Sequence, residues 1–112
     1  MVKSSAARLD AVFHALSDST RRSILRDVAA GEKTVSEVAK PYAMSLAAVS
    51  KHLNVLEEAE LIARQRRGSF QIVKLQAKGL RPADQWLAFY EKFWNERIDA
   101  LQSYLEDETK GE

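Results

Sequence analysis

The sequence of 112 residues contains no cysteine, which excludes a disulfide framework, a thiolate metal site and a cysteine nucleophile. Its apolar runs are only a few residues long, far short of the ~20 that cross a bilayer, and no signal-peptide core follows Lys3. It has only four glycines and two prolines, and 46% of its residues are hydrophobic, as in a chain that folds. We expect one cytoplasmic globular domain over residues 1–112, with no membrane partner.

The net charge of +1 hides an uneven distribution. Residues 1–76 carry 12 Lys and Arg against 8 Asp and Glu, whereas the remainder carries 5 against 8. A basic surface can hold a polyanion through phosphate contacts and counterion release. An excess of this size is also common in proteins that bind no anion, so the positions of the charges must decide.

Two helices are expected before residue 31. The first has a stripe of apolar residues spaced three or four apart, formed by Ala6, Leu9, Phe13 and Leu16. Asp18 or Ser19 can cap the second helix, and Gly31 can end it in a left-handed conformation. The second helix should therefore have about three turns.

Two more helices, joined by a tight turn, are expected next. Thr34 and Glu37 have the spacing of a capping box at the start of a helix of about two turns. Ser45 is a suitable N-cap for a helix over residues 45–58. That helix has a buried stripe formed by Val49, Leu53 and Leu56. The pair is typical of a helix-turn-helix.

A β-hairpin over residues 62–76 is predicted after these helices, because the pattern changes from helical spacing to alternation. Its two-residue loop, Gly68-Ser69, suits a type II′ turn. A last helix over residues 83–106 follows the breaker sequence K-G-L-R-P. The predicted fold class is therefore mainly α with a small β-hairpin.

The last helix has apolar residues over an arc too wide for one small domain to bury. A helix of this kind usually serves both a domain core and a partner, so we expect a homodimer that forms through the first and last helices. The expected interface residues are Leu9, Phe13, Trp86, Phe89, Tyr90, Phe93, Trp94 and Leu101. Trp86 and Trp94 are expected to fill the dimer core, with an effector pocket as the alternative.

A helix-turn-helix followed directly by a basic hairpin matches a winged helix, whose second helix enters the major groove of DNA while the wing touches the backbone. At about 100° per residue, Ala47, Lys51 and Asn54 project away from the buried stripe. The residues expected to contact double-stranded DNA are Ser45, Ala47, Ala48, Ser50, Lys51, His52, Asn54, Arg64, Arg66, Arg67 and Ser69. The alternatives are a solvated helix face and a charged hairpin edge.

Histidine is scarce, which argues against a multi-histidine metal site within one chain. His52 can contact a phosphate or be buried against the domain, and His14 is expected to be structural or interfacial. A site that joins histidine to carboxylates across a dimer is a weaker alternative, with ligands from Asp84, Glu91, Glu96 and Asp99. We therefore expect no metal and no cofactor. Arg21 and Arg22 can contact the DNA backbone or form an internal ion pair.

The chain resembles the ArsR/SmtB-type winged-helix regulators of bacteria and archaea. The resemblance rests on F-H-A-L-S-D-S-T-R-R-S-I-L, T-V-S-E-V-A, M-S-L-A-A-V-S-K-H-L-N-V-L-E-E-A-E-L-I and the wing R-R-G-S-F-Q. It implies a homodimeric repressor that binds a pseudo-palindromic operator and releases it when an inducer binds. The metal sensors of this family have thiolates near the third helix and histidines on the last helix, which this chain lacks. It therefore resembles a branch without metal boxes, with an unidentified small-molecule inducer.

Two other functions compete with a DNA-binding regulator. A winged helix can serve mainly in protein association, with weak non-specific DNA binding and the aromatic last helix as its docking surface. Catalysis is not expected, because His14, Ser17 and Asp18 are neighbours on a helix and its cap, which is not the geometry of a nucleophile, a base and an orienting group. No glycine-rich loop that could hold a phosphate is present either.

Overall fold

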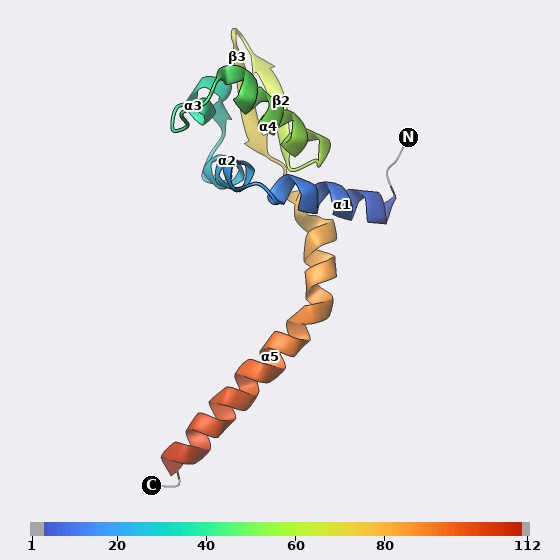
Figure 1. Cartoon of the computed structure of the whole chain (residues 1–112), viewed down its shortest axis with the longest axis vertical. Helices are drawn as coiled ribbons and strands as arrows, with labels where there is room; N and C mark the ends of the chain where they lie inside the picture. Colours follow the sequence, from blue (N-terminus) through green and yellow to red (C-terminus); the bar gives the residue numbers. More distant parts are fainter. Residues whose placement is uncertain (1–3, 111–112) are drawn as a thin grey trace.

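A long C-terminal helix projects from a small body of helices and a sheet in the computed structural model, which describes residues 4–110 (Figure 1). The molecule measures 68 × 35 × 22 Å. Its elements in chain order are α1 (Ser5–Leu16), α2 (Ser19–Ala29), β1 (Lys33–Thr34), α3 (Val35–Ala39), α4 (Leu46–Glu58), β2 (Ile62–Arg67), β3 (Phe70–Leu75), the short 3-10 helix η1 (Ala77–Leu80) and α5 (Arg81–Lys110). This is the predicted winged helix-turn-helix.

Side chains next to each helix start cap the first four helices, as the sequence predicts for the second to fourth of them. The Ser4, Asp18 and Ser45 side chains accept hydrogen bonds from backbone N–H groups three residues later. Asp18, and not Ser19, is therefore the cap of α2, and the hydrogen bond from the Arg21 backbone lowers the pKa of its carboxyl. Thr34 and Glu37 form the predicted capping box of α3.

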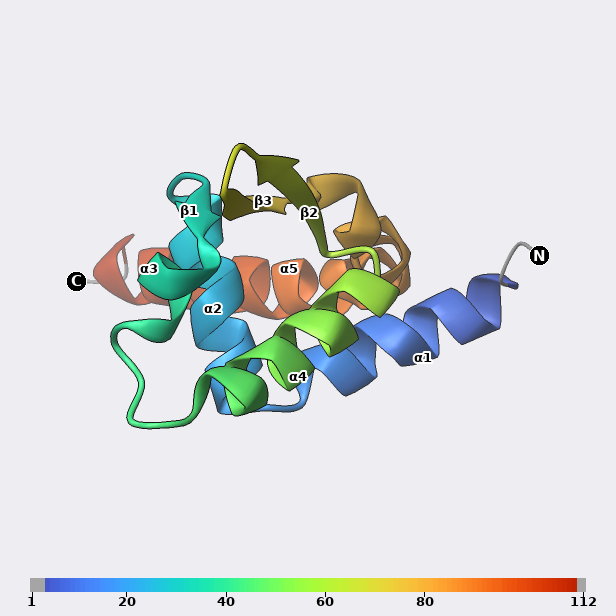
Figure 2. The ribbon, with the colours of Figure 1, turned by 90° about the horizontal axis from the view of Figure 1, so that it is seen from above.

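The core lies where α1, α2 and α4 meet the sheet. Val49, Leu53 and Leu56 of α4 are completely buried, as predicted. The predicted stripe of α1 is displaced, because Val12 and Ala15 are buried while Phe13 is 37% exposed. The reason is that α1 packs on α2 and α4 with one face and against α5 with another, so Phe13 faces α5. Figure 2 shows α1 and α4 lying close together, seen from above.

The sheet has three strands, although only a hairpin was predicted. Strand order is β1-β3-β2, and all pairs are antiparallel. Lys33 and Thr34 of β1 pair with Val73 and Ile72. A strand of two residues has no alternation that a sequence pattern could reveal. In the turn of the hairpin, φ is positive at Gly68 only, as the predicted type II′ turn requires.

α4 ends in a Schellman motif whose left-handed residue is not glycine. The Leu61 N–H donates to the carbonyl oxygen of Leu56 at 3.0 Å, and the Glu60 N–H donates to that of Glu57 at 2.9 Å. Glu60 has φ +61°, and no other non-glycine residue among residues 4–110 has a positive φ. Gly79 packs so closely on this turn that a Cβ there would overlap the Glu60 carbonyl oxygen. The turn after α4 therefore needs a glycine at position 79.

α5 is longer than the predicted helix over residues 83–106. It begins at Arg81, because a proline such as Pro82 is tolerated in the first turn of a helix, where its missing N–H leaves no bond unmade. It continues to Lys110, although the tail after residue 106 was expected to fray. Over the described residues, α5 and the other helices lack the uninterrupted apolar length that a bilayer crossing requires.

Replacing Gly79 by alanine should destabilise the fold by about 2 kcal/mol or more, because the new Cβ would overlap backbone atoms of Glu60. Gly31→Ala is the matched control. Gly31 was expected in a left-handed conformation, but its φ is not positive, and a Cβ at this position would have no atom within 4 Å. Gly31→Ala should therefore raise stability by up to ~1 kcal/mol. Urea unfolding of both variants at one protein concentration measures the difference, and equal losses would contradict the packing described.

Candidate nucleic-acid interface

The outer face of α4 carries small and polar residues. Ala47, Lys51 and Asn54 are exposed, and Ala48 and Ser50 are half-buried beside them. Ser45 is exposed, but its hydroxyl oxygen already accepts the Ala48 N–H at 3.1 Å as the helix cap. Small side chains at the start of a helix allow its backbone to come close to base edges. This face is therefore suited to enter a groove of DNA.

Two cations at this surface have no acidic partner among residues 4–110, namely Lys51 on α4 and Arg66 near the tip of the wing. Arg66 donates from Nε to the Gly68 carbonyl oxygen at 3.4 Å, which keeps most of its guanidinium free. Ser69 is exposed in the turn. Unpaired cations on neighbouring elements are the groups that contact phosphates at least cost.

Arg64 points from β2 onto α4. Its Nη2 lies 2.5 Å from Asn54 Oδ1 and 2.8 Å from Glu57 Oε1. The sequence predicts both Arg64 and Asn54 as DNA contacts, and the structure brings these two side chains together. The ion pair with Glu57 neutralises the charge of Arg64 in the free protein.

Arg67 and Lys74 share one carboxylate. Glu32 Oε1 lies 2.6 Å from Arg67 Nη1, and Glu32 Oε2 lies 3.6 Å from Lys74 Nζ. The hydrogen bond from Arg67 lowers the pKa of the Glu32 carboxyl, and the same contact raises the pKa of Arg67. The contribution of the Glu32–Arg67 contact to stability is therefore fully present above the ordinary pKa of a carboxyl group. It is lost as the pH falls through the lowered pKa of Glu32.

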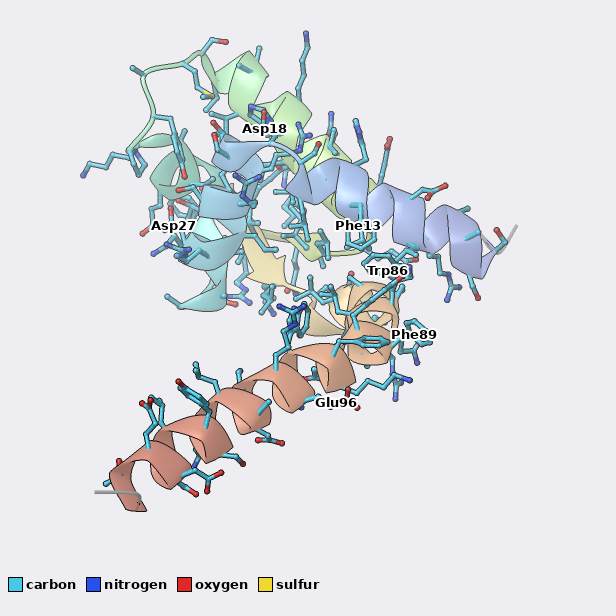
Figure 3. All side chains as sticks on the ribbon, turned by 60° about the horizontal axis from the view of Figure 1, so that its bottom comes forward. Phe13, Asp18, Asp27, Trp86, Phe89 and Glu96 are labelled. Atoms are coloured by element: carbon cyan, nitrogen blue, oxygen red, sulfur yellow. The ribbon has the colours of Figure 1, made fainter. Side chains whose placement is uncertain are left out.

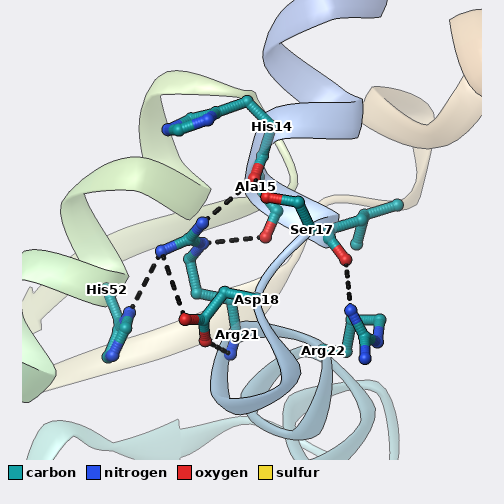
Figure 4. Close-up of polar contacts among 8 residues, drawn as sticks. His14, Ala15, Ser17, Asp18, Arg21, Arg22 and His52 are labelled. Atoms are coloured by element: carbon teal, nitrogen blue, oxygen red, sulfur yellow. Dashed lines mark hydrogen bonds and ion pairs between the residues drawn. The ribbon is translucent and has the colours of Figure 1, made fainter.

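Arg21 holds the end of α1 against α4 (Figure 4). Its Nε donates to the Ala15 carbonyl oxygen at 2.8 Å and its Nη2 to that of His14 at 3.0 Å. Both carbonyls belong to the last turn of α1, and that of His14 also accepts from the Ser17 N–H and hydroxyl. Arg21 Nη1 lies 3.3 Å from His52 Nδ1 on α4. Because a guanidinium only donates, Nδ1 is the acceptor in this contact.

The structure shows the predicted internal ion pair for Arg21, whereas Arg22 makes an internal hydrogen bond and no ion pair within residues 4–110. The Arg21 side chain is 11% exposed and lies 4.0 Å from the Asp18 carboxylate. Arg22 Nη1 donates to the Leu16 carbonyl oxygen at 2.7 Å. His52 is half-buried against Arg21, whereas His14 is exposed. No group of three potential metal-ligating side chains occurs within residues 4–110.

The aromatic residues predicted at a dimer interface form a cluster where α1 meets α5. Phe13 lies edge-on to Trp86 (Figure 3), with ring centroids 5.4 Å apart. The ring centroids of Trp86 and Tyr90 are 4.7 Å apart. Tyr90 also contacts Phe89 and Phe93. Leu9 is half-buried beside the core. Trp94 and Leu101 lie further along α5 and remain 52% and 59% exposed.

A cavity of about 300 Å³ lies between α1, the end of α4 and the start of α5. Neither Trp86 nor Trp94 lines this cavity. Its wall is mixed in character and includes Arg8, Val12, Glu60, Lys78, Arg81 and Gln85.

Comparisons with known proteins agree with this geometry. A family model described as a helix-turn-helix domain matches residues 16–65. The transcriptional repressor SdpR of Bacillus subtilis is 37% identical over 76 residues, which are 68% of this chain and 84% of that protein. The HTH-type transcriptional regulator Rv2034 of Mycobacterium tuberculosis is 31% identical over 99 residues, or 88% and 90% of the two chains.

A solved structure makes the family explicit. The crystal structure of the ArsR family transcriptional regulator RHA00566 has 32% sequence identity and a TM-score of 0.74, covering 85% of this chain and 97% of that one. The chain belongs to the ArsR family. This confirms the resemblance drawn from the sequence, and with it a DNA-binding regulator. The helix-turn-helix match over residues 16–65 includes α4 and the start of β2.

The sequence did not indicate three further residues of this ArsR-type surface. Leu46 is 58% exposed in the first turn of α4, although helical spacing places it beside the buried stripe. Glu57 and Glu32 neutralise wing arginines across separations of 7 and 35 residues. The i to i+3 spacing of Asn54 and Glu57 was a signal for a shared partner on one helix face. No local pattern connects Glu32 with Arg67.

Replacing Arg21 by lysine should destabilise the fold by about 2 kcal/mol, because one ammonium group cannot reach both α1 carbonyls and His52. Arg22→Lys is the matched control and should cost less than ~1 kcal/mol, since Arg22 makes one exposed contact. Urea unfolding followed by circular dichroism measures both changes. Equal effects would show that Arg21 does not have the stabilising role described here.

Replacing Glu32 by glutamine should tighten DNA binding roughly two- to tenfold at low salt, because Arg67 and Lys74 lose their internal counter-ion. The slope of log affinity against log salt concentration should become steeper by about one. Glu91→Gln makes the same charge change on α5 and should have a smaller effect. Fluorescence anisotropy with a labelled duplex at several salt concentrations measures both variants, and identical responses would contradict a specific role for Glu32.

Proposed function

We propose that this chain is a homodimeric transcriptional repressor that binds a pseudo-palindromic operator. It acts in the cytoplasm without catalysing a reaction and releases DNA when a small-molecule inducer binds. The observation that carries the proposal is the pair of unneutralised cations, Lys51 on the recognition helix and Arg66 on the wing, beside the exposed small residues of α4. Repression is supported by the name of the Bacillus subtilis relative.

A homodimer is supported by the apolar face of α5. Most of the large hydrophobic side chains that are exposed within residues 4–110 lie on this helix. Covering them with a second copy would place two recognition helices around a two-fold axis. Half-sites one helical turn apart, about 34–36 Å, would then match the two helices.

A titration of the full chain against its own upstream promoter DNA tests the proposal, with scrambled DNA as the control and several salt concentrations. We expect affinity of roughly 10⁻⁸ M or tighter for the promoter only, falling steeply with salt. The double variant Lys51→Ala/Arg66→Ala should lower the salt slope by about two. Lys92→Ala removes a cation from α5, which extends away from α4 and the wing, and should leave the slope unchanged.

The competing function is protein association through the exposed aromatic residues of α5. This function would be favoured over repression if the chain bound both DNAs equally weakly and if salt and the Lys51→Ala/Arg66→Ala substitutions left that binding unchanged. A selection from a random-sequence DNA library would detect the preferred sequence even if the operator lies elsewhere in the genome. Absence of any enriched sequence in that selection would contradict the proposed repressor.

A further inference from the structure

Arg64 joins the wing to the recognition helix at two points of one helix face. Its Nη2 contacts Asn54 Oδ1 at 2.5 Å, and its Nη2 and Nε contact Glu57 Oε1 at 2.8 and 3.3 Å. Asn54 and Glu57 are three residues apart, so both project on the same side of α4. The Arg64 side chain is only 22% exposed, whereas Asn54 is exposed. Glu57 therefore fixes the guanidinium, and the guanidinium in turn contacts Asn54.

The chemistry of the guanidinium determines which way the Asn54 amide faces. All its hydrogen-bonding groups are donors, so the amide atom next to it must be the oxygen. The two N–H donors of the amide group are then directed away from Arg64. In the free protein, Asn54 consequently offers two donors at the surface, while Arg64 already occupies one of the two lone pairs of its amide oxygen.

An occupied acceptor changes which base an asparagine can read. Asparagine reads adenine through two bonds, in which its oxygen accepts from N6 and its nitrogen donates to N7. An adenine amino group at Asn54 would have to share this oxygen with the positively charged guanidinium, which weakens the oxygen as an acceptor for a second donor. Guanine presents only acceptors at this edge, N7 and O6, and thus fits a donor group.

We propose that Arg64 is a positioning residue that makes Asn54 select guanine over adenine in the operator. The inference rests on the proposed DNA-binding function and adds a base preference to it. Arg64 acts here through Asn54 and Glu57, in contrast to Arg66, which donates to a carbonyl oxygen of its own turn. Arg66 therefore offers a matched control on the same strand.

The test is a DNA selection from a random library with the full chain, followed by affinity measurements on single-base variants of the selected site. Asn54→Ala identifies the base pair that Asn54 reads, as the position whose preference is lost. We expect guanine there for the unmodified chain. Arg64→Leu should raise the ratio of adenine to guanine affinity at that position roughly tenfold and leave preferences elsewhere unchanged. Arg66→Leu should weaken binding to all sequences alike.

A conservative variant separates positioning from a general loss of charge. Arg64→Lys keeps one donor near Asn54 Oδ1 and should restore part of the guanine preference. Adenine at the Asn54 position in the unmodified chain would overturn the inference. An Arg64→Leu variant that loses affinity equally for every sequence would overturn it too.

A measurement without DNA keeps this inference distinct from the proposed function. NMR of the free protein should show that Arg64→Leu shifts the side-chain amide resonances of Asn54, whereas Arg66→Leu leaves them in place. Unchanged Asn54 resonances in Arg64→Leu would overturn the positioning role by themselves. A selection that enriches no sequence would instead count against the proposed repressor, and the NMR result would still decide whether Arg64 positions Asn54.

Discussion

The apolar face of α5 is the constraint on which the arrangement of this molecule depends most. At about 100° per residue, its large side chains cover roughly half of the helix circumference, and the body of the domain reaches only the first turns. Exposed apolar surface on this scale is unfavourable in water, so a second surface must cover it. The proposed homodimer would cover this face and would present a second copy of α4 to a two-fold symmetric operator.

α1 connects that apolar face with α4. Phe13 on one side of α1 contacts Trp86 of α5. The last carbonyls of α1 accept hydrogen bonds from Arg21, which also contacts His52 of α4. In the proposed homodimer, a change in how the two copies pack would thus reach α4 through packed side chains and hydrogen bonds that already exist in one chain. In the free protein, the wing arginines other than Arg66 are paired with carboxylates.

Short-range features of this fold could be predicted from the sequence, whereas long-range ones could not. The capping box at Thr34 and the buried stripe of α4 follow from spacings within one helix. Strand β1 could not be found, because two residues become a strand only when β3 lies beside them. The sequence predicted the residues of the candidate site but not the contacts among them. That Arg64 contacts Asn54, or that Glu32 contacts Arg67, depends on how the wing folds back on the domain.

Sedimentation equilibrium of the full chain at micromolar concentration tests most directly whether a second copy covers α5. Leu101→Asp places a charge in the apolar face, and Ala88→Asp places the same charge at an exposed position on the opposite side of the helix. A dimer is expected for the unmodified chain and for Ala88→Asp, whereas Leu101→Asp should be monomeric because a buried, unpaired carboxylate is costly. A monomeric unmodified chain, or a Leu101→Asp variant that dimerises equally well, would contradict burial of this face in a homodimer.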